Sequence, residues 1–318
     1  MTPLARLTDP RRAPSAVDHR GLLFPRSQLD AVSVRATTDR YAAVWSSVLA
    51  SADAVRAAGS LELPGDSATI YYHARGRLMN LALAAVVTRD PGYVAGYESI
   101  VGDLAARGMD FWIGPDYPNR PRYQVYDGRA RYTGELETAA LASGLAISFD
   151  WIKPLLSSPT RERVYGFLLG TAYPLLKNST LFQSERWVMN HLCVIASALT
   201  LVALSLEGVR AEVRPPGDDE PILFRREDAD RIAAEGIPID ADVELISGAL
   251  GSWMETIDAD GSYGEGFHYW AYPVNCLFFA LEALANVREV ELPEMSCIAR
   301  SLEWAVYNQV GLYEHPEF

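Results

Sequence analysis

Residues 260–272, DGSYGEGFHYWAY, concentrate groups that can carry protons or stack on a ring. Three glycines separate Glu265, His268 and five aromatic residues, and the apolar run PVNCLFFALEALANV follows directly. Glycine allows a sharp turn and a close backbone approach. Tyr269 and Tyr272 are three residues apart, so they share a face if a helix begins there. These residue types fit a reactive loop, and they also fit an aromatic plug that closes one end of the fold.

A second cluster, NRPRYQVYDGRARY at 119–132, holds four arginines and three tyrosines on an expected loop. Arginine binds carboxylates through two parallel hydrogen bonds, and tyrosine offers a stacking face and a hydroxyl. This composition predicts a loop able to hold an acidic sugar, and the alternative is a solvated basic loop that pairs with the acidic surface. The candidate substrate-binding residues are Tyr126, Arg129 and Arg131, with Arg120 and Arg122 beside them.

The third group is Asn190 and His191, near the start of the apolar run at 186–208. Polar side chains are unfavourable in such a helix unless they have partners. Adjacent helical residues point about 100° apart, so we expect at most one of the two to face inward. A core histidine, or an amide that fixes a helix end, would explain the pair without chemistry.

The composition is that of an ordinary globular protein, with 318 residues, 49% of them hydrophobic and 22% charged. This length suffices for two average domains or one large domain. The net charge of −13 argues against nucleic-acid binding, because neutralising phosphates requires a basic face. It still permits an anionic sugar as partner, since a cleft can be locally positive in an acidic protein.

Several other features limit the class of protein. Cys193, Cys276 and Cys297 form no CxxC pair and are expected to be buried, reduced thiols, with neither a metal nor a cofactor implied. The longest apolar run, 192–206, is shorter than the ~20 residues of a membrane span. The N-terminal residues lack the apolar core of a signal peptide. We therefore expect a cytoplasmic protein, or a secreted or periplasmic one whose leader has been removed.

Helical periodicity runs through almost the whole chain, and alternating β-branched runs are scarce, which predicts an all-α fold. Successive long helices joined by short loops pack as antiparallel hairpins, and a ring of such hairpins is an α/α toroid. A solenoid is the alternative, but no fixed repeat is present. The polar segment at about 209–239 reads as an excursion from the ring. The expected helices are 27–58, 74–89, 92–107, 134–153, 159–177, 184–207, 240–257, 270–287 and 293–310.

Five stretches of the chain resemble the N-terminal domain of the heparinase II/III-like polysaccharide lyases, a group that includes alginate lyases. The stretches follow one another in the same order as in that family. The last two of these stretches are similar to the Asn/His helix and to the DGxxxEGxxYxxY loop of that family. The five stretches are RGLLFPRSQLDAV at 20–32, NLALAAVVTRDPGYVAGYESIVGDL at 80–104, GELETAALASGLAISFDWI at 134–152, MNHLCVIASALTLVALSL at 189–206 and DGSYGEGFHYWAY at 260–272.

The resemblance implies an α/α toroid that cleaves uronic-acid polysaccharides by β-elimination. Such an enzyme neutralises the uronate carboxylate, removes the C5 proton and protonates the leaving oxygen. Asn190 and His191 match the carboxylate-neutralising and proton-handling positions. Tyr269 matches the catalytic tyrosine, and Tyr272 is the alternative candidate for that role. Glu265 and His268 would orient that tyrosine or the sugar, and Tyr272 would also contact substrate.

Family members continue into a C-terminal β-sandwich that supplies another catalytic histidine. This chain ends in LYEHPEF, where no motif makes His315 a substitute, so we expect a single toroid domain over 1–318. Two other functions stay open. One is a non-catalytic carbohydrate binder or scaffold. The other is a toroid glycoside hydrolase, which needs two carboxylates, and its candidates are Glu265, Glu135 and Glu137.

Overall fold

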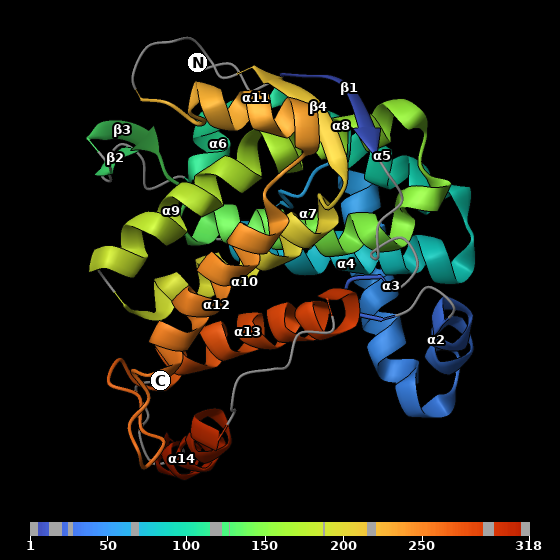
Figure 1. Ribbon diagram of the computed structural model, residues 1–318. Coiled ribbons are helices and arrows are strands. Elements are labelled where there is room, and N and C mark those ends of the chain that lie inside the picture. The colour runs from blue at the N-terminus through green and yellow to red at the C-terminus, as the bar shows by residue number, and fades with distance from the viewer. Residues whose placement is uncertain are drawn as a thin grey trace.

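The computed structural model in Figure 1 describes residues 6–12, 21–24, 28–64, 70–114, 123–126, 128–186, 188–214, 221–288 and 296–312. Helices make up most of these residues, which confirms the mostly helical fold. The strands of the described ranges form two antiparallel pairs. β1 (Arg6–Arg12) pairs with β4 (Val209–Arg214), and β2 (Tyr123–Tyr126) pairs with β3 (Arg129–Tyr132).

The helices follow one another through the chain with short connections. They are α2 (Leu29–Ala36), α3 (Ala42–Ala58), α4 (Ile70–Thr88), α5 (Pro91–Ala106), α6 (Met109–Ile113), α7 (Leu136–Ile152), α8 (Ser158–Phe167), α9 (Tyr173–Arg186), α10 (Asn190–Ser205), α11 (Arg226–Glu235), α12 (Ile239–Met254), α13 (Phe267–Arg288) and α14 (Ser296–Leu312). Single turns η2 (Asp39–Tyr41) and η3 (Lys153–Leu155) and the π-helical turn η4 (Leu168–Ala172) adjoin them.

Two of the expected helices are interrupted in the structure. The segment expected as one helix over 27–58 is broken, because Thr38 is extended between α2 and η2. The segment expected over 184–207 is two helices, since α9 ends at Arg186 and Met189 is extended before α10. The excursion at 209–239 contains β4 and α11. Each break is only a few residues long, and the apolar residues on both sides of it keep the helical period. The sequence pattern therefore does not reveal the break.

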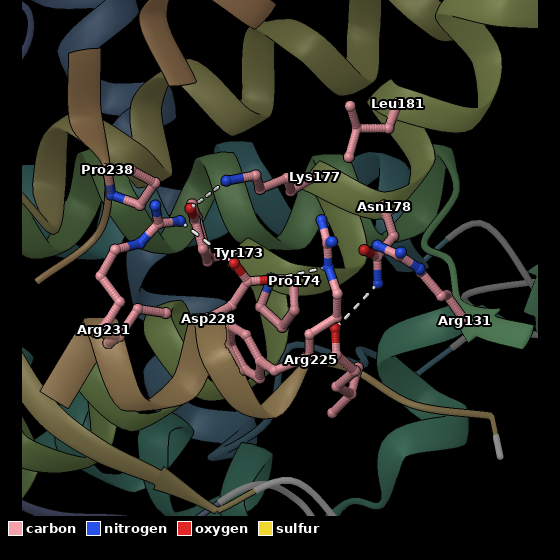
Figure 2. A pocket seen from close by; sticks show the side chains of 13 residues that line it. Arg131, Tyr173, Pro174, Lys177, Asn178, Leu181, Arg225, Asp228, Arg231 and Pro238 are labelled. Atoms are coloured by element: carbon pink, nitrogen blue, oxygen red, sulfur yellow. Dashed lines mark hydrogen bonds and ion pairs between the residues drawn. The ribbon is translucent and has the colours of Figure 1, made fainter. Parts of the chain in front are cut away.

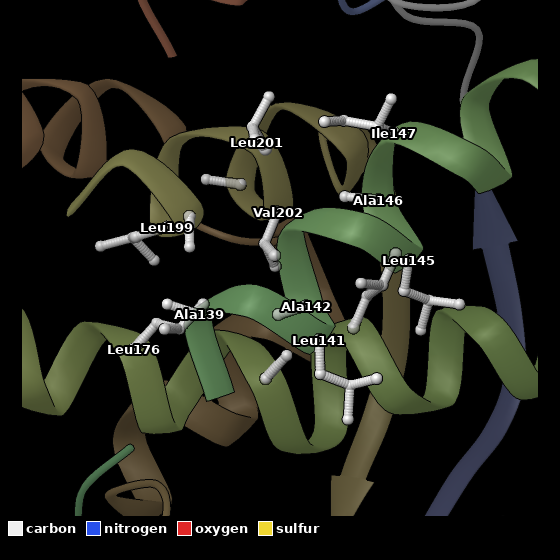
Figure 3. Packing of buried hydrophobic residues seen from close by; sticks show 14 of the residues in the cluster. Ala139, Leu141, Ala142, Leu145, Ala146, Ile147, Leu176, Leu199, Leu201 and Val202 are labelled. Atoms are coloured by element: carbon white, nitrogen blue, oxygen red, sulfur yellow. The ribbon is translucent and has the colours of Figure 1, made fainter. Parts of the chain in front are cut away.

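Four long helices, α4, α7, α10 and α13, pack side by side in that order (Figure 1). Helices α3 and α5 pack against α4, and α9 and α12 pack against α10. Both α7 and α10 are buried around nearly their whole circumference, as expected for helices enclosed by others. Figure 3 shows the packing between them. Leu141 and Leu145 of α7 lie there with Leu176 of α9 and with Leu199 and Val202 of α10.

The first and last helices of this row are joined by side-chain contacts. Arg75 of α4 donates hydrogen bonds to the side chains of Asn275 and Cys276 on α13. The approach of α4 to α7 depends on Gly144, where an added Cβ would lie 2.5 Å from the Arg75 Cα. The absence of a side chain at this position therefore sets how closely the two helices pack.

The remaining expectations have mixed outcomes. Cys193 and Cys276 are buried and free, as expected, whereas Cys297 is half-buried. None of the helices in the described ranges is both long and apolar enough to cross a membrane. Arg120, Arg122 and His315 lie outside the described residues.

Candidate functional site

The loop before α13 brings Glu265 to the start of α10. Its Oε2 atom accepts hydrogen bonds from the Asn190 backbone N–H at 3.0 Å and from the Asn190 side-chain amide at 2.9 Å. The Tyr263 hydroxyl donates to the same oxygen, and the Trp253 indole donates to that hydroxyl at 3.1 Å. One carboxylate oxygen thus holds two segments together that are 75 residues apart.

The electrostatics of this cluster follow from its hydrogen bonds. Partial burial acts to raise the pKa of Glu265, but the donors Tyr263 and Asn190 outweigh it and hold that pKa below its ordinary value. Burial and the hydrogen bond to Glu265 raise the pKa of Tyr263. Glu265 is therefore ionised and Tyr263 neutral at physiological pH.

The loop needs Gly261 for its path. Gly261 has φ +87° and packs against the backbone of α14, where an added Cβ would lie 2.4 Å from the Arg300 carbonyl oxygen. Gly266 also has φ +87°, directly before α13 begins at Phe267. Only glycine adopts this conformation readily. Gly261 and Gly266 thus turn the backbone as expected. Gly264 does not have a positive φ.

A second contact joins the starts of α7 and α10. His191 Nδ1 lies 3.4 Å from Glu135 Oε2. Glu135 is the N-cap of α7 and forms a capping box with Thr138, whose hydroxyl donates to the Trp112 carbonyl oxygen. The capping box satisfies backbone groups that a helix start leaves unpaired. It also holds the Glu135 carboxylate in place beside His191.

A narrow hollow lies between α4, α7, α10 and α13. The α10 residues Val194, Ala198 and Leu201 face it, and His191 continues their stripe one turn toward the helix start. On α13, Tyr272 and Cys276 line it, and Tyr269 lies one turn before Tyr272. The residues lining the hollow are Arg75, Ala139, Ala140, Ser143, Val194, Ser197, Ala198, Leu201, Tyr272 and Cys276.

Sequence reasoning missed Arg75, the charged residue of this lining. Its guanidinium donates to Asn275 Oδ1 at 2.8 Å and to Cys276 Sγ at 3.2 Å, and it lies over the Phe279 ring. A signal was present in the sequence, because no aspartate or glutamate lies three or four residues from Arg75 on its helix. An arginine on a helix commonly has such a partner.

The structure brings together only some of the candidate residues. Asn190 is buried against Glu265, and His191 is half-buried against Glu135, so both side chains have partners at the helix start. The side chain of Tyr269 is 58% exposed, and in the described part of the chain no hydrogen bond joins it to Asn190 or His191. His268 is also exposed and packs edge-on against the Phe267 ring.

The arginine segment is a β-hairpin, and its two described arginines differ. Arg129 is exposed on β3, whereas Arg131 is buried, with its guanidinium over the Tyr126 ring. Arg131 lines a larger hollow between α9 and α11. That hollow shares no residue with the one beside Arg75. The hairpin is thus not the simple loop that was expected.

Figure 2 shows Asp228 among the basic residues that line the larger hollow. Lys177 Nζ lies 2.6 Å from the buried Asp242 carboxylate, which also accepts from the Tyr173 hydroxyl. Arg225 and Arg231 both lie 3.3 Å from Asp228. These cations are largely neutralised within the protein, so the hollow is a weaker anion site than its content of basic residues suggests.

Comparison with known proteins adds no identification. No protein-family model matches the chain, and no curated protein is significantly similar to it.

Proposed function

We propose that this protein is an α/α-toroid polysaccharide lyase that cleaves uronic-acid polymers by β-elimination. The proposal rests on the resemblance to heparinase II/III-like lyases. The observation that best supports it is the arrangement of His191 and Tyr269 on helix turns that continue the lining of one hollow. Their residue types match the two proton-transfer roles that the reaction needs.

In the proposed reaction, a uronate residue lies across the mouth of the hollow. A proton leaves its C5 atom, the bond between C4 and the glycosidic oxygen breaks, and a C4–C5 double bond forms. Tyr269 is exposed enough to reach the sugar and supplies the proton to the leaving oxygen. His191, oriented by Glu135, handles the C5 proton. General acid–base groups of this kind contribute about 10²–10⁴-fold each.

Asn190 has two parts in this proposal. One of its amide hydrogens is occupied by Glu265, and a primary amide has a second for the substrate carboxylate. Glu265 acts by positioning, because its carboxylate holds Asn190 and thereby the start of α10. The low pKa of Glu265 also disfavours the hydrolase alternative, since a glycosidase acid requires a raised pKa.

The test is to incubate the purified chain with alginate, polygalacturonate and hyaluronan and to follow the ultraviolet absorbance of unsaturated uronate ends. An increase in absorbance with one of these polymers is the expected result. New reducing ends without new unsaturation would instead assign a hydrolase. Binding to a polymer without any turnover would assign a non-catalytic carbohydrate binder.

A further inference from the structure

Arg75 has different interaction partners from the other basic residues near the two hollows. Lys177, Arg225 and Arg231 each lie within ion-pair distance of an aspartate. Arg75 has only neutral partners among the described residues, namely an amide oxygen, a thiol and an aromatic ring. It is half-buried and lines the hollow between the four central helices.

A partly desolvated charge without a counter-ion is unfavourable, because burial weakens its hydration and the neutral partners of Arg75 among the described residues replace only part of it. An anion bound from solution would offset this cost. The neutral contacts also restrict the guanidinium to one orientation, so less conformational entropy is lost when a ligand binds. A planar carboxylate matches this donor group, since arginine can bind its two oxygens at once.

Asn275 adds donors next to the guanidinium. Its Oδ1 atom accepts from Arg75, so the Nδ2 group, with two hydrogens, points to the other side of the amide. Asn275 is exposed on α13, three residues after Tyr272, and residues at that spacing share a helix face. Arg75 and Asn275 therefore present donors next to each other at the edge of the hollow, on the face of α13 that also carries Tyr272.

We propose that Arg75 and the Asn275 amide bind the carboxylate of one uronate residue of the polysaccharide. This inference deepens the proposed lyase function and rests on it for the identity of the ligand. It assigns carboxylate recognition to α4 and α13, in addition to Asn190 at the start of α10. The protein then selects charged sugars over neutral ones of the same shape.

The experiment measures binding by titration calorimetry with three probes, a mannuronate trisaccharide, a galacturonate trisaccharide and a hyaluronan tetrasaccharide. Each is compared with its carboxyl-reduced, neutral counterpart. For the acidic probe that binds best, Arg75→Gln should weaken binding at least about tenfold. Binding of the neutral counterpart should change little. Arg75→Lys keeps the positive charge but loses the paired N–H donors of the guanidinium. Its affinity for the acidic probe should lie between that of the native protein and that of Arg75→Gln.

Two further variants separate recognition from folding and from net charge. Arg163→Gln removes the same charge from an exposed position on α8 and should bind like the native protein. Asn275→Asp places a carboxylate beside Arg75 and supplies the missing counter-ion. It should keep the fold, because it adds an ion pair, and should still weaken binding of the acidic probe. This variant decides the matter if Arg75→Gln does not fold.

The outcomes distinguish the inference from the lyase proposal. Undiminished binding of the acidic probe by Arg75→Gln, or by Asn275→Asp, overturns the inference, even if the native protein shows elimination. Binding that depends on Arg75 without any elimination supports the inference and rejects the lyase. Failure of the native protein to bind any of the three acidic probes overturns both.

Discussion

At the scale of single residues, the hydroxyl of Tyr269 is the group on which the proposed chemistry depends. Tyr269→Phe keeps the ring but removes the exchangeable proton, and the side chain is 58% exposed, so the fold should be unaffected. We expect elimination to fall by at least about 10²-fold. Initial rates from the unsaturated-product assay measure this. Tyr272→Phe is the matched comparison, and a larger loss in that variant would transfer the catalytic role to Tyr272.

Glu265 should make its contribution to stability in a pH-dependent way. Its folded-state pKa lies below its ordinary value, so the stabilisation is complete above the unfolded-state pKa and is lost as the pH falls through the folded-state pKa. At pH 7, Glu265→Gln should lower the free energy of unfolding by ~1 kcal/mol, a value reduced by the partial exposure of the side chain.

Urea unfolding of the two proteins across the pH range tests this expectation. The difference in free energy of unfolding between native and variant should begin to shrink as the pH falls below the unfolded-state pKa of glutamate, about 4.3, and should disappear once the pH has fallen through the lower folded-state pKa. Ser262→Ala alters the same loop without touching the carboxylate and serves as control. A difference that stays constant from neutral to acidic pH would show that Glu265 acts through shape and not through charge.

At the scale of the elements, the contact between α4 and α7 depends on the absence of a side chain at Gly144. An added Cβ would lie 2.5 Å from the Arg75 Cα, which belongs to backbone and cannot move alone. Gly144→Ala should therefore destabilise the protein by ~1–2 kcal/mol, since overpacking costs more than the helix propensity of alanine returns.

The control for this substitution is another helical glycine. Gly248 of α12 has open space where its Cβ would be, so Gly248→Ala should stabilise the protein by ~0.5–1 kcal/mol. Thermal or urea unfolding compares the two variants. Equal effects at both positions would mean that helix propensity, and not the approach of α4 to α7, governs the outcome. Gly144→Ala should also displace Arg75 and weaken binding of acidic oligosaccharides.

At the scale of the whole molecule, the net charge of −13 opposes the approach of a polyanion. Salt screens such long-range repulsion, whereas a partly buried contact such as that of Arg75 is screened much less. We therefore expect kcat/KM for the acidic polymer to rise several-fold as the ionic strength goes from ~10 to ~100 mM. Steady-state rates in sodium chloride measure this, and a neutral, carboxyl-reduced polymer is the control for binding. A steady fall in kcat/KM would contradict the expectation.

The mostly helical fold was predictable from sequence alone, because apolar residues recur at the helical period in every long segment. The aromatic, glycine-rich loop and the start of α10 were also identified, since their residue types are unusual beside apolar runs. The breaks at Thr38 and Met189 were not predictable, because the apolar pattern continues on both sides of them.

The partners of the reactive groups were decided only by the tertiary structure. Glu265 meets Asn190 across 75 residues, and Arg75 meets Asn275 across 200. Such contacts depend on how the helices stack, and local patterns carry no information about that. Sequence can show that a basic residue has no acid near it on its own helix, but it cannot show whether an acid from a distant helix pairs with it. The tertiary structure thus distinguishes Arg75 from the basic residues of the larger hollow. The energetic effect of a charge depends on the groups that the fold places beside it.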